Sequence, residues 1–125
     1  VVGAVLLPGR RAPAVVTEAM VRRMQPGTVI VDISIDQGGC VETMAPRGYD
    51  DPAYLRHGVW HLGVTNLPGA VPRTASQALS AALLPQVAAL ARTPAGEEPA
   101  SLASALSIRG GRLVDDRVRA DPAPA

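Results

Sequence analysis

Apolar residues gather in three short runs in the first half of the chain, and each run leads into a polar or glycine-rich loop. The runs occupy residues 1–6, 28–35 and 58–64. Residues 28–35 are dense in β-branched side chains and follow the turn-forming Pro26 and Gly27, a pattern typical of a buried strand. We therefore expect three strands, with 28–35 as the strand around which the rest of the chain is organised.

A short helix is predicted between the first two runs. Thr17 suits a helix N-cap, and Glu18 in the first turn favours the positive end of the helix dipole. Met20, Val21 and Met24 would form its buried side. A strand, a helix and a second strand form a crossover unit, which predicts parallel strands with a right-handed connection.

The second half of the chain is dominated by one long predicted helix. Thr74 and Gln77 have the spacing of a capping box, which places the start of the helix near Thr74 and its end at about Arg92. After it we expect a helical turn over 101–106, a turn between two small elements over 108–113, and a helical segment over 114–119. The apolar face of the long helix is Leu79, Leu83, Val87 and Leu90.

Candidate chemistry lies where the three strands end. The following loops contain residues 7–9, 36–39 and 66–69. Because the carboxyl ends of parallel strands share one edge, these loops would meet where open α/β sheets bind ligands. Asp36 with Gly38 and Gly39 is the most suggestive of them, since glycines allow a sharp turn and close approach of a ligand. The alternative is an ordinary strand exit in which Asp36 only caps a turn.

Residues 40–56 are predicted to form a long loop, and no metal site is expected. His57 and His61 are four residues apart, which on a strand separates them by about 13 Å. His61 is therefore expected to be a hydrogen-bonded, partly buried histidine rather than a zinc ligand.

Length, charge and composition limit the partners and the cellular location that we expect for the protein. A chain of 125 residues with a net charge of +1 can hold one domain or a piece of one, and its start on a strand without an upstream partner favours a piece. All twelve basic residues are dispersed arginines, so no nucleic-acid partner is expected. No apolar run reaches the roughly 18 residues of a membrane helix, and the single Cys fits a reducing compartment. We predict a cytoplasmic protein that binds neither nucleic acid nor a membrane.

The expected fold is α/β, the second half of a Rossmann-type NAD-binding domain with parallel strands. The sequence contains no Gly-x-Gly-x-x-Gly, so the half that binds pyrophosphate is not expected here. A long helix would then return toward a catalytic domain outside these 125 residues.

Two motifs of the chain are specific: Asp-Gln-Gly-Gly-Cys at 36–40 and Asn-Leu-Pro-Gly-Ala-Val-Pro-Arg-Thr at 66–74. They resemble the alanine dehydrogenase family, which is related to the transhydrogenase alpha subunit. The resemblance runs from residue 1 to about 92 and more weakly to about 118. It implies a partial NAD-binding domain over 1–70, an interdomain helix over 71–92, a carboxyl-terminal segment of the catalytic domain over 93–119, and a disordered tail over 120–125.

The resemblance also implies a reaction: reversible oxidation of L-alanine by NAD to pyruvate and ammonium, in a homo-oligomer for which the family suggests a hexamer. It implies that Asp36 is catalytic, orienting the nicotinamide ribose and balancing charge as the imine forms. This chain alone would be inactive, because the family's other catalytic groups lie elsewhere. The residues implied to bind NAD are Val5, Leu6, Ile33, Ser34, Ile35, Asp36, Val64, Thr65, Asn66 and Leu67.

One departure from the family pattern concerns a contact with the cofactor. The family commonly carries an arginine that reaches the cofactor where this chain has Ala45, and Arg47, two residues on, is the candidate substitute. Two alternatives to an alanine dehydrogenase remain open at this point. One is the nucleotide-binding part of a nicotinamide nucleotide transhydrogenase alpha subunit, and the other is a non-catalytic truncated fragment.

Overall fold

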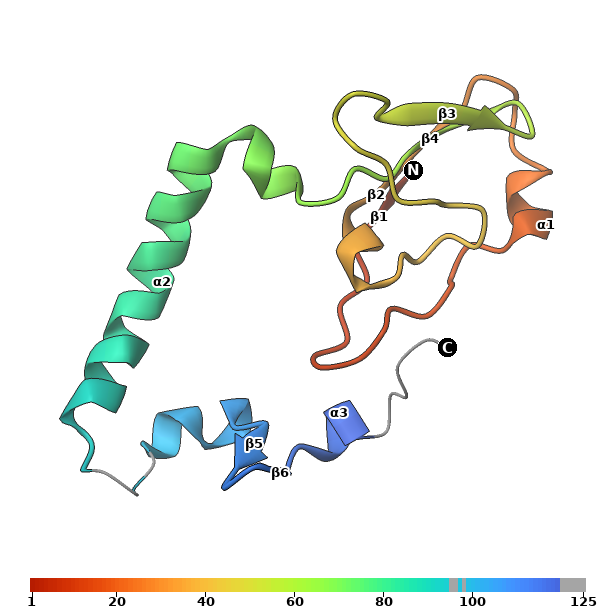
Figure 1. Ribbon diagram of the computed structural model, residues 1–125. Helices are drawn as coiled ribbons and strands as arrows, with labels where there is room; N and C mark the ends of the chain where they lie inside the picture. The colour runs from red at the N-terminus through yellow and green to blue at the C-terminus, as the bar shows by residue number, and fades with distance from the viewer. Residues whose placement is uncertain (95–96, 98, 120–125) are drawn as a thin grey trace. The chain divides into compact units, whose positions relative to one another are not determined.

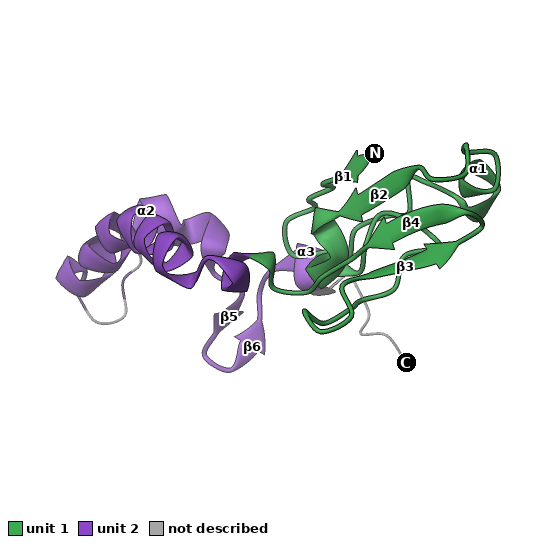
Figure 2. Ribbon diagram, turned by 90° about the horizontal axis from the view of Figure 1, so that it is seen from above, with its two compact units in different colours: residues 1–67 green, residues 68–125 purple. Residues whose placement is uncertain are grey.

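The computed structural model describes residues 1–94, 97 and 99–119. They divide into two compact units, Val1–Leu67 and Pro68–Ala125, which are described separately (Figure 2). The predicted disordered tail, 120–125, lies outside the described residues.

Unit 1 is built on a four-stranded sheet in the order β1-β2-β4-β3 (Figures 1 and 2). The three predicted strands are β1 (Val2–Gly3), β2 (Val29–Asp32) and β4 (Val59–Leu62). They pair in parallel, β1 with β2 and β2 with β4, so the predicted parallel arrangement is confirmed. The carboxyl ends of all three strands therefore lie at one edge of the sheet.

The fourth strand, β3 (Ala53–Arg56), corrects the prediction of a long loop over 40–56. It pairs antiparallel with β4, and Arg56 faces Val59 across a two-residue turn. That turn consists of His57 and Gly58, both with positive φ, 54° and 75°. Two-residue hairpin turns need such angles, for which Asn-Gly is the usual sequence. Because His57 takes the place of the usual asparagine, the sequence does not reveal this hairpin turn.

Strand β2 stops at Asp32 rather than at the predicted Ile35. The chain turns there into a 3₁₀ helix, η1 (Ile33–Gln37), and the Asp32 carboxylate accepts a hydrogen bond from the Ser34 N–H. The apolar run continues to Ile35, but the strand ends at Asp32, because the Asp32 side chain caps the 3₁₀ helix that follows. Gly38 closes the turn at a φ of 96°, a conformation that favours glycine.

The core of unit 1 packs the short helix α1 (Glu18–Val21) against the sheet. Thr17 is its N-cap as predicted, accepting a hydrogen bond from the Met20 N–H (3.3 Å). The predicted buried position of Met20 is wrong, since its side chain is 53% exposed in a helix of only one turn. The buried cluster consists of Val21, Ile30, Cys40, Val41 and Val59.

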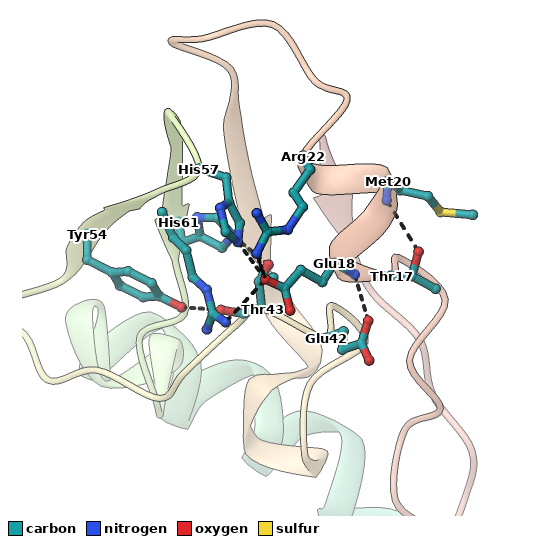
Figure 3. Close-up of polar contacts among 10 residues, drawn as sticks. Thr17, Glu18, Met20, Arg22, Glu42, Thr43, Tyr54, His57 and His61 are labelled. Carbon is teal, nitrogen blue, oxygen red and sulfur yellow. Dashed lines mark hydrogen bonds and ion pairs between the residues drawn. The ribbon is translucent and has the colours of Figure 1, made fainter.

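A polar cluster ties α1 to the β3–β4 hairpin (Figure 3). Glu18 Oε1 accepts hydrogen bonds from His57 Nε2 and Arg22 Nη2, both at 2.7 Å. Arg56 Nη2 lies 3.7 Å from the same oxygen. Glu42 Oε2 accepts the Glu18 N–H (2.6 Å), which adds a link to the loop after η1.

Unit 2 contains the long helix α2 (Pro72–Arg92), which follows the short 3₁₀ helix η2 (Leu67–Ala70). The end at Arg92 is as predicted, but the predicted capping box is wrong. The helix begins at Pro72 with Val71 as N-cap and no side-chain cap, so Thr74 and Gln77 lie inside it. Proline suits the first helical turn because no intrahelical partner is lost there. All 21 residues of α2 are described, and none is buried.

The remaining small elements of unit 2 follow the predicted order. They are η3 (Ala100–Ala105), β5 (Ile108–Arg109), β6 (Arg112–Leu113) and α3 (Asp116–Arg119). Strands β5 and β6 form a hairpin around Gly110 and Gly111, which both have positive φ. Within the described residues, no helix is long and apolar enough to cross a membrane.

Candidate functional site

Asp36 joins two of the loops that were predicted to meet at the sheet edge. It lies on η1, directly after β2, and both of its carboxylate oxygens accept the N–H of Asn66, at 3.1 and 3.0 Å. Asn66 lies in the loop after β4 and has a φ of 53°, a left-handed conformation that asparagine tolerates. The Asp36 side chain remains exposed. The carboxylate thus caps a backbone group of the neighbouring loop and still faces solvent.

Tyr49 holds the same loop from its other side, a contact that the sequence did not reveal. Its hydroxyl donates to the carbonyl oxygens of Asn66 (2.7 Å) and Leu67 (3.2 Å). A lone aromatic residue in a loop gives no sequence signal for such a role. Asn66 is therefore fixed through both its N–H and its carbonyl group.

A hollow of about 170 Å³ opens beside η1. Val5 and Leu6 come from the segment after β1, and Ile33 and Ser34 from η1; all four are predicted cofactor residues. Leu6 and Ile33 are 65% and 52% exposed, which leaves apolar surface open at the hollow. Ligand pockets usually measure about 300–1,000 Å³, so the hollow suits one ring of a ligand rather than a whole dinucleotide. The full lining is Ala4, Val5, Leu6, Ile33, Ser34 and Gln37.

Of the other predicted cofactor residues, Asp36 and Asn66 are exposed, and the remaining four are buried or half-buried. Ile35 and Val64 are buried, at 7% and 3% exposure. Thr65 donates its N–H to the Arg47 carbonyl oxygen (3.1 Å), and Leu67 is half-buried. Ile35 and Val64 can therefore face a ligand mainly through their backbone.

Asp32 is a buried carboxylate that the prediction left out of the site. It is 0% exposed, and its oxygens accept hydrogen bonds from backbone and side-chain groups of Ser34, Cys40 and Val41. The available signal was an acidic residue inside the apolar run 28–35. A buried carboxylate needs hydrogen-bond donors, and those donors must come from the loop around it.

Arg47, the candidate substitute at the position of Ala45, is engaged away from the hollow. Its Nη1 donates to Asp51 (2.9 Å), and its guanidinium carbon lies 4.7 Å from the centre of the Tyr54 ring. Its backbone runs beside Val64, with the Arg47 N–H donating to Gly63 O (2.9 Å). In this conformation Arg47 contributes to the site through its backbone.

Both histidines have protein partners. His61 is fully buried, more than predicted, and its Nδ1 lies 2.9 Å from the Val59 carbonyl oxygen. A carbonyl oxygen only accepts, so Nδ1 carries a proton and donates it; Nε2 forms a hydrogen bond with the Thr43 hydroxyl (2.7 Å). His57 is bound to Glu18. Among the described residues, no group of three or more His, Cys, Asp or Glu side chains could hold a metal ion.

Comparison with known proteins matches residues 1–116 to the family "Alanine dehydrogenase/PNT, C-terminal domain". The chain belongs to this family. It is similar to the alanine dehydrogenase of Staphylococcus haemolyticus, with 55% identity over 92 residues, 73% of this chain and 25% of that protein. Alanine dehydrogenase 2 of Staphylococcus aureus is 54% identical over the same length and share. The chain thus spans about a quarter of the length of the curated relatives that it matches.

Solved structures support the same relationship. An L-alanine dehydrogenase superposes with a TM-score of 0.76 at 48% identity, covering 95% of this chain and 34% of that one. A transhydrogenase from Sinorhizobium meliloti gives a TM-score of 0.54 at 33% identity, covering 61% of this chain and 22% of that one. The chain is therefore an α/β member of this family, as the sequence predicted, and family membership implies a nicotinamide nucleotide cofactor.

The hollow and the Asp36 loop have the size and side chains to hold one ring of such a nucleotide. Apolar side chains at the hollow suit the face of a planar ring, and Asp36 places a carboxylate on η1, the 3₁₀ helix that also lines the hollow. No residue of the hollow is basic, so it offers no charge partner for a diphosphate. The fit is limited to one end of the cofactor.

Proposed function

We propose that this chain supplies the nicotinamide end of the cofactor site in an NAD-dependent oxidoreductase that converts L-alanine reversibly to pyruvate and ammonium. One observation carries the proposal: the single turn η1 both lines the hollow, through Ile33, Ser34 and Gln37, and carries Asp36. A ring held in the hollow would lie beside a carboxylate that the neighbouring loop keeps in place.

NAD, when bound, accepts a hydride from the substrate carbon. The residues of this chain then bind, orient and balance charge. Leu6 and Ile33 exclude water from one face of the ring by covering it with apolar surface. Asp36 orients the nicotinamide ribose and offers negative charge near the substrate nitrogen, where positive charge develops as the imine forms. The proposed cofactor contacts comprise all ten predicted residues, with Ile35 and Val64 contributing their backbone.

The remaining parts of the proposal concern the assembly around this chain. We expect NAD as the nucleotide, a homo-oligomeric protein, and a cytoplasmic location, as the alanine dehydrogenase motifs suggest. The proposed domain boundaries are 1–70, 71–92 and 93–119. The unit boundary at Leu67 supports a division close to residue 70.

A transhydrogenase function is the second candidate, because a transhydrogenase shares the fold. The alanine dehydrogenase relatives are more similar, with 48% identity over 95% of the chain against 33% over 61%. Alanine oxidation is therefore favoured.

A chimera tests the proposal. Residues 1–92 of this chain would replace the corresponding segment of the S. haemolyticus alanine dehydrogenase, which is 55% identical to it over 92 residues. We expect alanine-dependent reduction of NAD, followed by NADH absorbance, within roughly tenfold of the parent enzyme, since each tenfold loss corresponds to only about 1.4 kcal/mol. A folded chimera that binds NADH but does not oxidise alanine would contradict the proposal.

A further inference from the structure

Asp32 accepts hydrogen bonds from both ends of the loop that carries Asp36. Its Oδ1 accepts the Ser34 N–H (3.0 Å) and the Ser34 hydroxyl (2.6 Å), at the start of η1. Its Oδ2 accepts the N–H groups of Cys40 (2.7 Å) and Val41 (3.2 Å), where the loop rejoins the core. The Cys40 thiol lies 3.4 Å from Oδ1. One buried carboxylate thus closes the whole segment between residues 32 and 41.

The loop has little freedom to close in another way. Gly39 has a φ of 75°, and a Cβ atom there would lie 3.1 Å from Asp32 Oδ2. The loop backbone therefore passes close to the carboxylate. Asp36 lies between the two tied ends, and its contact with Asn66 depends on where those ends hold the turn.

We propose that Asp32 is a positioning residue: it sets the place of Asp36 without touching substrate or cofactor. This inference rests on the proposed function, since it assigns Asp32 a part in the same site. Asp32 acts only as a hydrogen-bond acceptor. Two separate oxygens accept from opposite ends of one loop, a task that an amide cannot perform.

Asp32→Asn changes one of those two oxygens into an NH₂ donor. That donor would face either the Ser34 N–H or the N–H groups of Cys40 and Val41, so one end of the loop would lose its anchor. A displacement of about 1 Å in a reacting group can lower a rate by about 10²-fold. We expect kcat of the chimera to fall by roughly ten- to hundredfold.

The control is Thr43→Val, which removes another buried hydrogen bond of unit 1, to His61, at a site outside the loop 32–41. It should lower Tm but leave kcat within about twofold of the parent chimera. If Asp32 has only a structural role, Asp32→Asn and Thr43→Val will have the same effect on kcat at the same loss of Tm, and the proposal fails.

A double-mutant cycle with Asp36→Asn gives the decisive comparison. When Asp36 has already lost its charge, a further Asp32→Asn change should lower kcat by less than about twofold. An equal loss in both backgrounds would overturn the positioning role. Ser34→Ala, which removes one donor to Oδ1, is the milder variant should Asp32→Asn fail to fold; we expect a loss of several-fold that likewise disappears beside Asp36→Asn.

Hydrogen exchange of the cofactor-free chimera supplies a readout that is independent of turnover. Asp32→Asn should speed amide exchange over 33–41 and at Asn66, whereas Thr43→Val should not. Unchanged exchange in both segments would contradict the proposal.

The two proposals can fail separately. A parent chimera without alanine oxidation would overturn the proposed function, and the positioning role with it. An active parent chimera without the Asp32–Asp36 coupling would overturn the positioning role alone.

Discussion

Asp36 combines an exposed carboxylate with a fixed position. Both of its oxygens accept one N–H, that of Asn66, and Tyr49 holds the carbonyl group of the same residue. A single acceptor oxygen would maintain this contact. The second oxygen and the negative charge therefore go beyond what the loop requires, and in the proposed function they act on the substrate side.

Asp36→Asn separates the charge from the geometry. The amide oxygen can still accept the Asn66 N–H, so the turn η1 and the hollow should persist. We expect kcat of the chimera to fall by about 10²–10⁴-fold, the range for loss of a charged or proton-transferring group, with the Kd for NADH within roughly threefold. Steady-state kinetics and fluorescence titration of NADH measure the two effects.

The matched control is Asp50→Asn, which removes an exposed carboxylate from the loop before β3. Its kcat should equal that of the parent chimera. An Asp36→Asn variant with undiminished kcat would remove Asp36 from the mechanism and leave it the role of a turn cap.

The sequence did not reveal the role of Asp32, for a physical reason. Asp36, Gly38 and Gly39 could be singled out because they follow a predicted strand, at the edge where open α/β sheets bind ligands. Asp32 looks like part of an apolar strand, and its function depends on donors at positions 34, 40 and 41, which only the folded loop brings to it. Pairings of this kind cannot be obtained from spacing.

At the scale of elements, Glu18 connects α1, the β3–β4 hairpin and the loop after η1 (Figure 3). The hydrogen bond from His57, and then that from Arg22, lower the pKa of Glu18 below its ordinary value of 4.5. A carboxyl group with a lowered folded-state pKa stabilises the fold above its unfolded pKa. That contribution disappears as the pH falls through the folded value.

Glu18→Gln should therefore destabilise the 125-residue chain at about pH 6, and this loss should disappear at an acidic pH below the folded-state pKa of Glu18, where the carboxyl group is protonated in both states. Thermal unfolding followed by circular dichroism at the two pH values checks this. Glu97→Gln, an exposed carboxyl group in the segment after α2, should show no such pH-dependent difference. An equal loss of Tm at both pH values would assign the effect of Glu18→Gln to packing.

The elements that sequence analysis located are those whose signals are local. A run of β-branched residues predicted β2, an apolar run predicted β4, and Thr17 predicted the start of α1. Strand β3 was missed because the turn after it is His57-Gly58 and not the Asn-Gly pair that usually marks a two-residue hairpin turn. The start of α2 was misplaced because Thr74 and Gln77 imitate a capping box, while Pro72 begins the helix with no side-chain cap at all.

At the scale of the whole molecule, many large apolar side chains are exposed, and no described residue covers them. On the sheet of unit 1, Val29, Trp60 and Leu55 are register neighbours and are 49%, 46% and 56% exposed. On α2 of unit 2, the predicted apolar face is present, but each of its four residues is about half exposed or more, from 48% to 60%. The sequence predicts which face of α2 is apolar; it contains no information on what covers that face.

These surfaces and the small hollow lead to a prediction about the isolated chain. The match to the solved L-alanine dehydrogenase covers 34% of that chain, and the hollow of about 170 Å³ in this chain has room for one end of NAD. We expect no alanine-dependent NAD reduction by the isolated chain and a Kd for NADH weaker than that of the chimera by roughly 10²-fold or more, because the lost phosphate contacts are charge-assisted hydrogen bonds of about 1.5–3 kcal/mol each. Absorbance at the NADH band and calorimetric titration, with the chimera as positive control, measure both. Steady turnover by the isolated chain would show that these residues hold a complete active site, and the division of labour proposed for Asp36 and its loop would then be wrong.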